Sequence, residues 1–170
     1  MQRVLMLLLC VFGCGAFGLR LADRLKSRSQ ALHDMHDGIR ALTSAIRHTR
    51  RPLQQIAAGL AGQSGVSFWR VFSERLQRGE DAEKAFCGAL EAESGGGPLG
   101  ALTKHDRALL ISFSMSLGKT DRCTQAEQSE LALESLRALI EGADELYAKK
   151  GRVYRVLGLF LGLGLGILLW

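Results

Sequence analysis

The placement of charge along the chain limits what it can fold into. Two segments without a charged residue, Val4–Leu19 and Val156–Trp170, stand at its ends, and almost every charged residue lies between them. A helix that is apolar all round has to be buried in a large core or in lipid, and the middle of this 170-residue chain is small. The sequence therefore predicts membrane helices over residues 1–20 and 156–170, flanking a polar domain over 21–155.

Both apolar segments are slightly shorter than the about 20 residues that a bilayer-crossing helix needs. The long side chains of flanking arginines can extend them, because each charge can reach the lipid headgroups. The basic residues lie mainly on the inner sides of the two segments: Arg20, Arg24, Lys26, Arg28, Lys149, Lys150, Arg152 and Arg155. By the positive-inside rule, the polar domain stays in the cytoplasm.

A second interpretation of the N-terminus is a signal peptide. The stretch Val11–Cys14 (VFGC) resembles a lipoprotein cleavage box that ends in the cysteine to be lipidated. The single basic residue Arg3 before the apolar run and the basic cluster after it oppose export. The four cysteines suggest neither a disulfide framework nor a zinc site, in keeping with a reducing compartment.

Helical spacing dominates the middle of the chain, and no alternating strand pattern of any length appears there. Apolar residues recur every three, four or seven positions from Leu25 to Ile46, which predicts a helix over 21–48 with one buried face. Further helices are expected over 52–60, up to Gly79, over 81–92, from Thr103 to Gly118, and from Thr124 onward. These segments can bury their apolar faces only against one another, so the sequence predicts an all-α six-helix bundle.

Several local signals set the helix ends. Gly79 suits a left-handed cap, and Glu93–Gly100 has the composition of a flexible, structureless connector. Thr103–Asp106 and Thr124–Glu127 both have capping-box spacing. Nothing clearly stops the last helix before the apolar tail. The residues expected to face inward from the last two helices are Leu109, Leu110, Phe113, Leu117, Ala132, Leu136, Leu139, Ala143 and Leu146.

Motifs for catalysis are weak. Gly118–Thr120 (GKT) lacks the earlier glycine and the preceding strand of a phosphate loop, so a helix cap explains it better. His33–Asp37 (HDMHD) lies off the buried stripe; an exposed polar face explains it, and the alternative is a metal- or ligand-sensing domain. Arg47–Pro52 (RHTRRP) suits a solvated turn or an acidic partner. We expect no enzyme activity, cofactor, metal or small-molecule substrate, and the dispersed charge does not favour nucleic acid.

The tail glycines Gly158, Gly162 and Gly166 repeat every four residues and form two overlapping GxxxG patterns. Such a ridge lets another membrane helix approach closely. The first apolar segment has a similar ridge of small residues, namely Cys10, Cys14 and Gly18. The two segments are therefore expected to pack together or against neighbouring membrane helices.

Ser116–Gln125 (SLGKTDRCTQ), followed by a lysine-bearing helix that leads into a glycine-rich tail, closely resembles the stage III sporulation protein AB family. Ala45–Leu53 is similar to the family's segment before its second helix, and Phe72–Phe86 to its third and fourth helices. Two departures are visible: Ala45 stands where the family often has an acidic residue, and Phe86 where it tends to have tryptophan.

The resemblance implies a six-helix cytoplasmic domain similar to the platform protein F of type II secretion. It also implies a non-catalytic scaffold in a complex that joins mother cell and forespore, located in the mother-cell membrane facing the forespore. The expected partners are other stage III subunits, including a hexameric ATPase and multi-span membrane proteins, together with the bilayer. The residues expected at the joint between the last two helices, for structure or for a partner, are Leu117, Gly118, Asp121 and Gln125.

Overall fold

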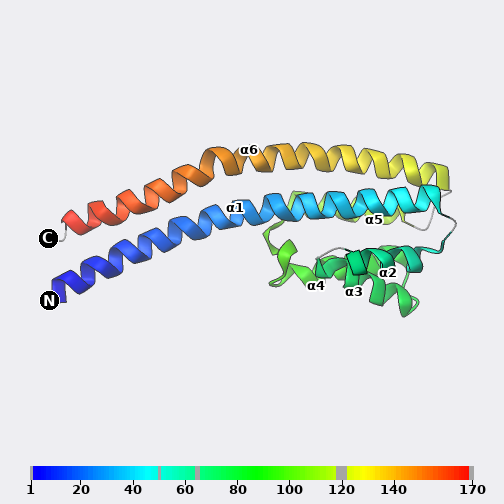
Figure 1. The fold of residues 1–170 in the computed structure, drawn as a ribbon, viewed down its shortest axis with the longest axis horizontal. Helices are drawn as coiled ribbons and strands as arrows, with labels where there is room; N and C mark the ends of the chain where they lie inside the picture. The colour runs from blue at the N-terminus through cyan, green and yellow to red at the C-terminus, as the bar shows by residue number, and fades with distance from the viewer. Residues whose placement is uncertain (1, 50, 64–65, 118–121, 169–170) are drawn as a thin grey trace. The chain divides into compact units, whose positions relative to one another are not determined.

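The computed structural model describes the backbone of residues 2–49, 51–63, 66–117 and 122–168, and the side chains of 20–49, 51–62, 66–117, 128–151, 153, 156 and 160. Over this part of the chain it contains six α-helices, one 3-10 helix and no strand, which confirms the all-α prediction (Figure 1). The elements in chain order are α1 (Gln2–His48), α2 (Leu53–Gln63), α3 (Ser67–Gln77), α4 (Ala82–Ser94), η1 (Pro98–Ala101), α5 (Lys104–Ser116) and α6 (Arg122–Leu168).

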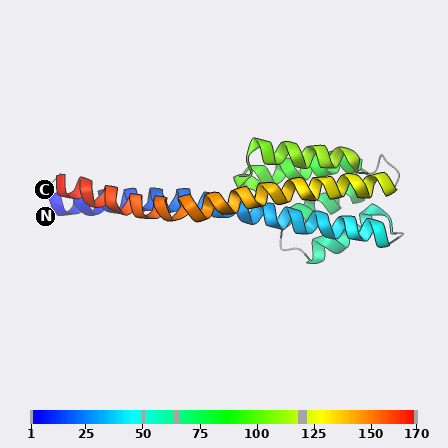
Figure 2. The same cartoon turned by 90° about the horizontal axis from the view of Figure 1, so that it is seen from above.

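The chain divides into two compact units. The terminal-helix unit comprises Met1–Ser29 with Gly142–Trp170, and the central unit comprises Gln30–Glu141. The central unit contains α2 to α5 together with the C-terminal part of α1 and the N-terminal part of α6, as Figures 1 and 2 show from two sides. Consecutive helices from α2 to α5 contact one another.

In the terminal-helix unit, the first part of α1 and the last part of α6 run antiparallel. The Ser29 hydroxyl on α1 donates a hydrogen bond to the Asp144 carboxylate on α6. The last helix continues through Gly142 and Gly151, as expected from the lack of a stop signal, and α1 is likewise unbroken. In the part of the chain that the structure describes, no helix has both the length and the apolar character needed to cross a membrane.

The core of the central unit is built around an aromatic cluster, whose neighbouring ring centroids lie 4.9 to 6.1 Å apart, mostly edge to face. Such pairs contribute about 0.5–1.5 kcal/mol beyond their buried area. Three helices supply the rings: Phe68, Trp69 and Phe72 from α3, Phe86 from α4 and Phe113 from α5. The cluster therefore ties α3, α4 and α5 together.

The α1 helix closes over this cluster through a glycine. A Cβ placed on Gly38 would collide with the Trp69 indole, so only glycine allows this close approach. The predicted apolar stripe of α1 is buried over most of its length: Leu32, Met35, Ile39 and Leu42 are fully buried. At its two ends, Leu25 and Ile46 are half-buried.

Two of the predicted helix-end signals are confirmed. Thr103 and Asp106 form a reciprocal capping box at the start of α5: the Thr103 N–H donates to the Asp106 carboxylate (2.8 Å), and the Asp106 N–H donates to the Thr103 hydroxyl (3.2 Å). Gly79 follows α3 with a φ of 84°, which provides the left-handed turn.

The prediction of a structureless connector over Glu93–Gly100 was wrong. Its first two residues belong to α4, and Pro98–Ala101 forms η1. The proline pre-sets the first position of this turn, and Leu99 is completely buried. Burial of the Leu99 side chain thus holds Pro98–Ala101 against the core, although the glycine-rich composition alone suggested a flexible segment.

Two expectations for α6 were also wrong. The helix begins at Arg122, so Thr124 lies inside it and not at a capping position. Leu146 is 37% exposed, and Ala132 and Leu139 are only half-buried, as is Leu109 on α5. The buried stripe of α6 runs through Leu136, Ile140 and Ala143, so Leu136 and Ala143 are confirmed and Ile140 takes the place expected for Leu139.

Candidate functional site

The predicted joint between the fifth and sixth helices is only partly described. Leu117 caps the C-terminus of α5, donates its N–H to the Ser114 carbonyl (3.0 Å) and is fully buried. Gly118 and Asp121 lie outside the described residues. Gln125 lies in the first turns of α6, and its side chain is also outside the description. The role of the joint therefore stays a prediction.

The predicted membrane ridges lie on regular helix backbone. Cys10, Cys14 and Gly18 belong to α1, and Gly158, Gly162 and Gly166 belong to α6. The four-residue spacing places each set of three on one face of its helix. Their side-chain surroundings lie outside the described residues, so their packing also stays a prediction.

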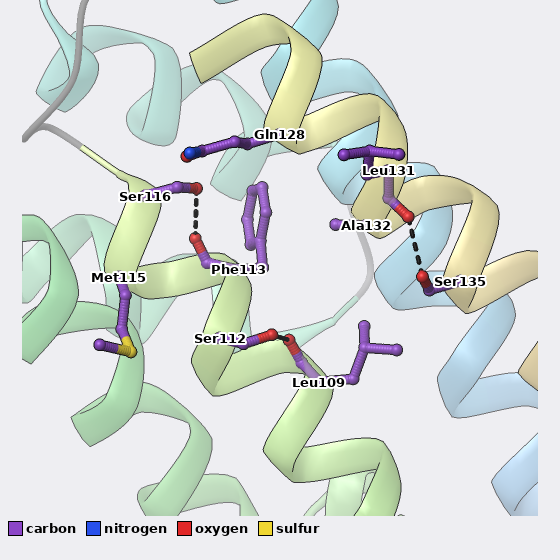
Figure 3. A pocket seen from close by; sticks show the side chains of 9 residues that line it. All are labelled: Leu109, Ser112, Phe113, Met115, Ser116, Gln128, Leu131, Ala132 and Ser135. Atoms are coloured by element: carbon purple, nitrogen blue, oxygen red, sulfur yellow. Dashed lines mark hydrogen bonds between the residues drawn. The ribbon is translucent and has the colours of Figure 1, made fainter. Parts of the chain in front are cut away.

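A cavity lies beside the joint. It is an open groove of about 420 Å³ between α5 and α6, within the central unit. In Figure 3 the Phe113 ring stands between the two helices. The groove is lined by Leu109, Ser112, Phe113, Met115 and Ser116 from α5 and by Gln128, Leu131, Ala132 and Ser135 from α6.

Serine hydroxyls along the groove are occupied by their own helices. Ser112 donates to the Leu109 carbonyl (2.7 Å), Ser116 to the Phe113 carbonyl (2.6 Å), and Ser135 to the Leu131 carbonyl (2.9 Å), as the dashed lines in Figure 3 mark. The groove presents polar and apolar surface in similar amounts. Its lining residues include no acid, base or thiol.

Apolar side chains are exposed at the groove and beside it. Leu131 is 65% and Met115 56% exposed, and Ile111, one turn before Met115 on α5, is 41% exposed. They are the large hydrophobic residues that the described part of the central unit exposes. Exposed apolar patches of this kind commonly mark interaction sites. The groove floor is continuous with the core, because Phe113 also lies 5.8 Å from the Phe86 ring.

The two charged motifs of the sequence, RHTRRP and HDMHD, contribute no residue to the lining of this groove. Arg47 of the RHTRRP segment pairs with Glu130 of α6 at 2.5 Å, which links the two long helices within the central unit. In HDMHD, the His36 ring lies 3.3 Å from the Asp37 carboxylate. Partial burial, aided by the Asp37 charge, raises the pKa of Asp34, and His33 opposes that rise. No group of three metal-ligating side chains occurs among the described residues.

Sequence reasoning missed the groove because it looked for buried stripes and chemical motifs. A signal was present: Ile111 and Met115 are apolar but lie off the predicted stripe of the fifth helix, and Leu131 lies off that of the sixth. Large apolar residues that helical periodicity places on the solvent-exposed face of a helix are candidates for contact with another chain.

Comparison with known proteins identifies the family. The model of the family described as stage III sporulation protein AB matches residues 3–170. The chain belongs to the stage III sporulation protein AB family. It is also 29% identical over 157 residues to stage III sporulation protein AB of Bacillus subtilis (strain 168), covering 89% of this chain and 90% of that protein.

A solved structure supports the fold. The structure of a stage III sporulation protein AB matches 71% of this chain, with a TM-score of 0.62 and 23% sequence identity, and 96% of the solved chain is covered. The family resemblance inferred from Ser116–Gln125 and the tail is thus confirmed, and the chain is a sporulation protein.

Proposed function

We propose that this stage III sporulation protein AB family member is a non-catalytic platform subunit of a sporulation complex that links mother cell and forespore. Its central unit lies in the cytoplasm and binds partner proteins, and its apolar ends hold it in the mother-cell membrane. The observation that carries the proposal is the α5–α6 groove, which exposes Met115 and Leu131 without a catalytic group in its lining. Family membership supplies the sporulation context.

Membrane attachment is supported by the charge pattern of the sequence. The uncharged segments Val4–Leu19 and Val156–Trp170 are bordered on their inner sides by basic residues, which favours a cytoplasmic central unit. In this proposal the ridges Cys10–Cys14–Gly18 and Gly158–Gly162–Gly166 pack against each other or against multi-span subunits. Val153, Val156 and Phe160 are 54%, 48% and 64% exposed, and lipid or a neighbouring helix would cover them.

The cytoplasmic partner in this proposal is a hexameric ATPase. The groove is suited to an apolar anchor on that partner, and the adjacent joint of Leu117, Gly118, Asp121 and Gln125 holds the ends of α5 and α6 in register. Burial of Leu117 next to the groove supports this positioning role. A platform that binds the motor on its central unit and membrane subunits through its ends couples the two.

Co-purification from sporulating cells tests the platform role. The full-length chain with Leu131→Gln and Met115→Gln should recover the ATPase about tenfold less well, because a central apolar anchor of an interface typically contributes more than about 1 kcal/mol. Both side chains are more than half exposed, so the fold should persist, as circular dichroism would check. The matched control is Ala138→Gln, which changes an exposed α6 residue outside the groove.

Two outcomes count against the proposal. Equal recovery of the ATPase and membrane subunits by the groove variant and the control would show that the groove is not the docking surface. Release of the intact chain into the supernatant of detergent-free lysates would show that its ends are not anchors.

A further inference from the structure

A second groove lies on another part of the central unit, between α1 and α2. Its volume is about 190 Å³. Ala41 and Ala45 on α1 and Gly59 on α2 line it, together with Ile56 and Leu60, which are 7% and 8% exposed and give it an apolar floor; Arg51, in the link between the helices, also lines it. The side chains at Ala41, Ala45 and Gly59 are minimal, so the groove stays open.

The fold itself does not explain the glycine in this groove. A Cβ on Gly59 would meet nothing within 4 Å, and the φ of this residue is not positive. Gly38 differs, because the Trp69 indole leaves no room for a Cβ there. Glycine is a poor helix former, so at position 59 it weakens α2 without any gain in internal packing. A close approach of another chain would account for it.

The chain segment that supplies the groove residues is basic. Gly38–Ser73 contains no Asp or Glu and five arginines, a formal charge of +5 that equals the net charge of the whole chain. Of these arginines, Arg47 is paired with Glu130. Arg51, which lines the groove, is exposed and forms no ion pair with any described residue. Free positive charge beside an apolar groove favours a partner that carries negative charge.

The groove shape favours a helix over a flat lipid surface. Ala41 and Ala45 on α1 and Thr49, directly after its end, follow one another at four-residue spacing, and the Thr49 hydroxyl donates back to the Ala45 carbonyl at 2.6 Å. Such a row of small groups forms a channel into which a ridge of side chains from a second helix can pack.

We propose that the α1–α2 groove binds an acidic amphipathic helix of a partner protein. An aliphatic side chain of that helix packs over Ile56 and Leu60 against Gly59, and a carboxylate of that helix faces Arg51. This inference rests on the proposed platform function and extends it, because a platform with two separate grooves can hold two partners at once.

The test uses full-length protein in neutral detergent and a fluorescent synthetic helix with Leu at i, i+4 and i+7 and Glu at the exposed positions. Fluorescence anisotropy should show saturable binding that weakens with salt. Gly59→Leu fills the groove and should weaken binding about tenfold or more. Gly62→Leu is the matched control: it makes the same change in the same helix, also in open space, but outside the groove lining, and should bind like the parent.

Arg51→Gln isolates the charge contribution. It should weaken binding severalfold and reduce the salt dependence, whereas a helix with Lys in place of Glu should not bind. Absence of binding, or equal affinities for the Gly59 and Gly62 variants, would overturn the proposal. Binding of phosphatidylglycerol vesicles that Gly59→Leu abolishes, without peptide binding, would assign the groove to lipid instead.

The two proposals can fail separately. If the Leu131 and Met115 variant loses the ATPase while the Gly59 and Gly62 variants bind the peptide equally, only the α1–α2 inference fails. If the Gly59 variant alone loses the peptide and the Leu131 and Met115 variant still recovers the ATPase, the α5–α6 docking surface fails and the second groove stands.

Discussion

The two units of the chain bury their apolar side chains to very different extents. In the central unit, Phe68, Phe72 and Phe86 are completely buried among other rings. In the terminal-helix unit, the Val153, Val156 and Phe160 side chains are 54%, 48% and 64% exposed. The central unit therefore supplies its own core, whereas the terminal helices leave apolar surface for something else to cover.

The described polar contacts of the terminal-helix unit include one between its two helices and one within α6. Ser29 bonds to Asp144 across the two helices, and Lys149 pairs with Glu145 one turn away on α6. Exposed ion pairs at this spacing contribute little to stability, because solvent screens them. Because the buried aromatic core lies in the central unit, matched substitutions in the two units should have unequal effects on stability.

The largest expected difference is between Phe86→Ala and Phe160→Ala. Loss of the Phe86 ring leaves a cavity beside Phe68, Phe72 and Phe113, and should destabilise the central unit by about 3–5 kcal/mol. The same change at the exposed Phe160 should alter unfolding by less than about 0.5 kcal/mol. Hydrogen exchange of the α3 and α4 amides in the detergent-solubilised full chain measures the effect of each variant. Equal protection in the two variants would contradict the expected difference between the units.

Replacing a glycine by alanine should change stability in opposite directions in the two units. Gly38→Ala forces a methyl group into the Trp69 indole and should destabilise the central unit by about 1–3 kcal/mol. Gly142→Ala, in the terminal-helix unit, meets nothing within 4 Å and should stabilise α6 by up to about 1 kcal/mol. Urea unfolding followed by far-UV circular dichroism gives both values. Destabilisation by both substitutions would mean that an unseen contact covers Gly142.

Much of the fold could be predicted from the sequence, because its signals are local. The stripe around Leu32 and Met35, the left-handed Gly79 and the Thr103 capping box each depend on neighbours within about one or two turns. Burial of Leu99 could not be predicted, because it depends on which distant helices happen to enclose that turn. The position of Gly38 against Trp69 is a tertiary contact of the same kind.

The candidate sites were less predictable. Helical periodicity assigns each residue to a solvent-exposed or a buried face. Whether the exposed faces of two neighbouring helices leave a groove depends on the distance between those helices. Leu131 and Met115 become informative only when α5 and α6 are placed side by side. Gly59 becomes informative only when the space around it is known to be empty. Chemical motifs gave no guide, because binding surfaces of this kind use common apolar and basic residues.

A smaller effect is expected at the capping box. Thr103→Ala removes the hydroxyl that accepts the Asp106 N–H, and should cost about 1 kcal/mol. Thr103→Ser keeps the hydroxyl and should cost less. Exchange of the Asp106 amide reports on the bond directly. If Ala and Ser behave alike, α5 is held by the burial of Leu110 and Phe113 and not by its cap.

The smallest effects should appear in the pH dependence, with opposite signs in the two units. Burial and the neighbouring Asp37 charge raise the pKa of Asp34 above 3.8, so the folded state holds its proton more tightly than the unfolded state does. Stability from this group is therefore present at low pH and is lost as pH rises through the folded-state pKa. Asp34→Asn should remove that loss.

Glu145 in the terminal-helix unit should titrate the other way. The hydrogen bond and charge of Lys149 lower the pKa of Glu145 below 4.5, so its contribution is present above that value and is lost as pH falls through the folded-state pKa. Carboxyl NMR titration of the full chain should place the Asp34 midpoint above its ordinary value and that of Glu145 below. Because Glu145 is fully exposed to solvent, added salt should move its titration midpoint back toward the ordinary value. A midpoint that does not change with salt would indicate that a partner or lipid shields this turn of α6.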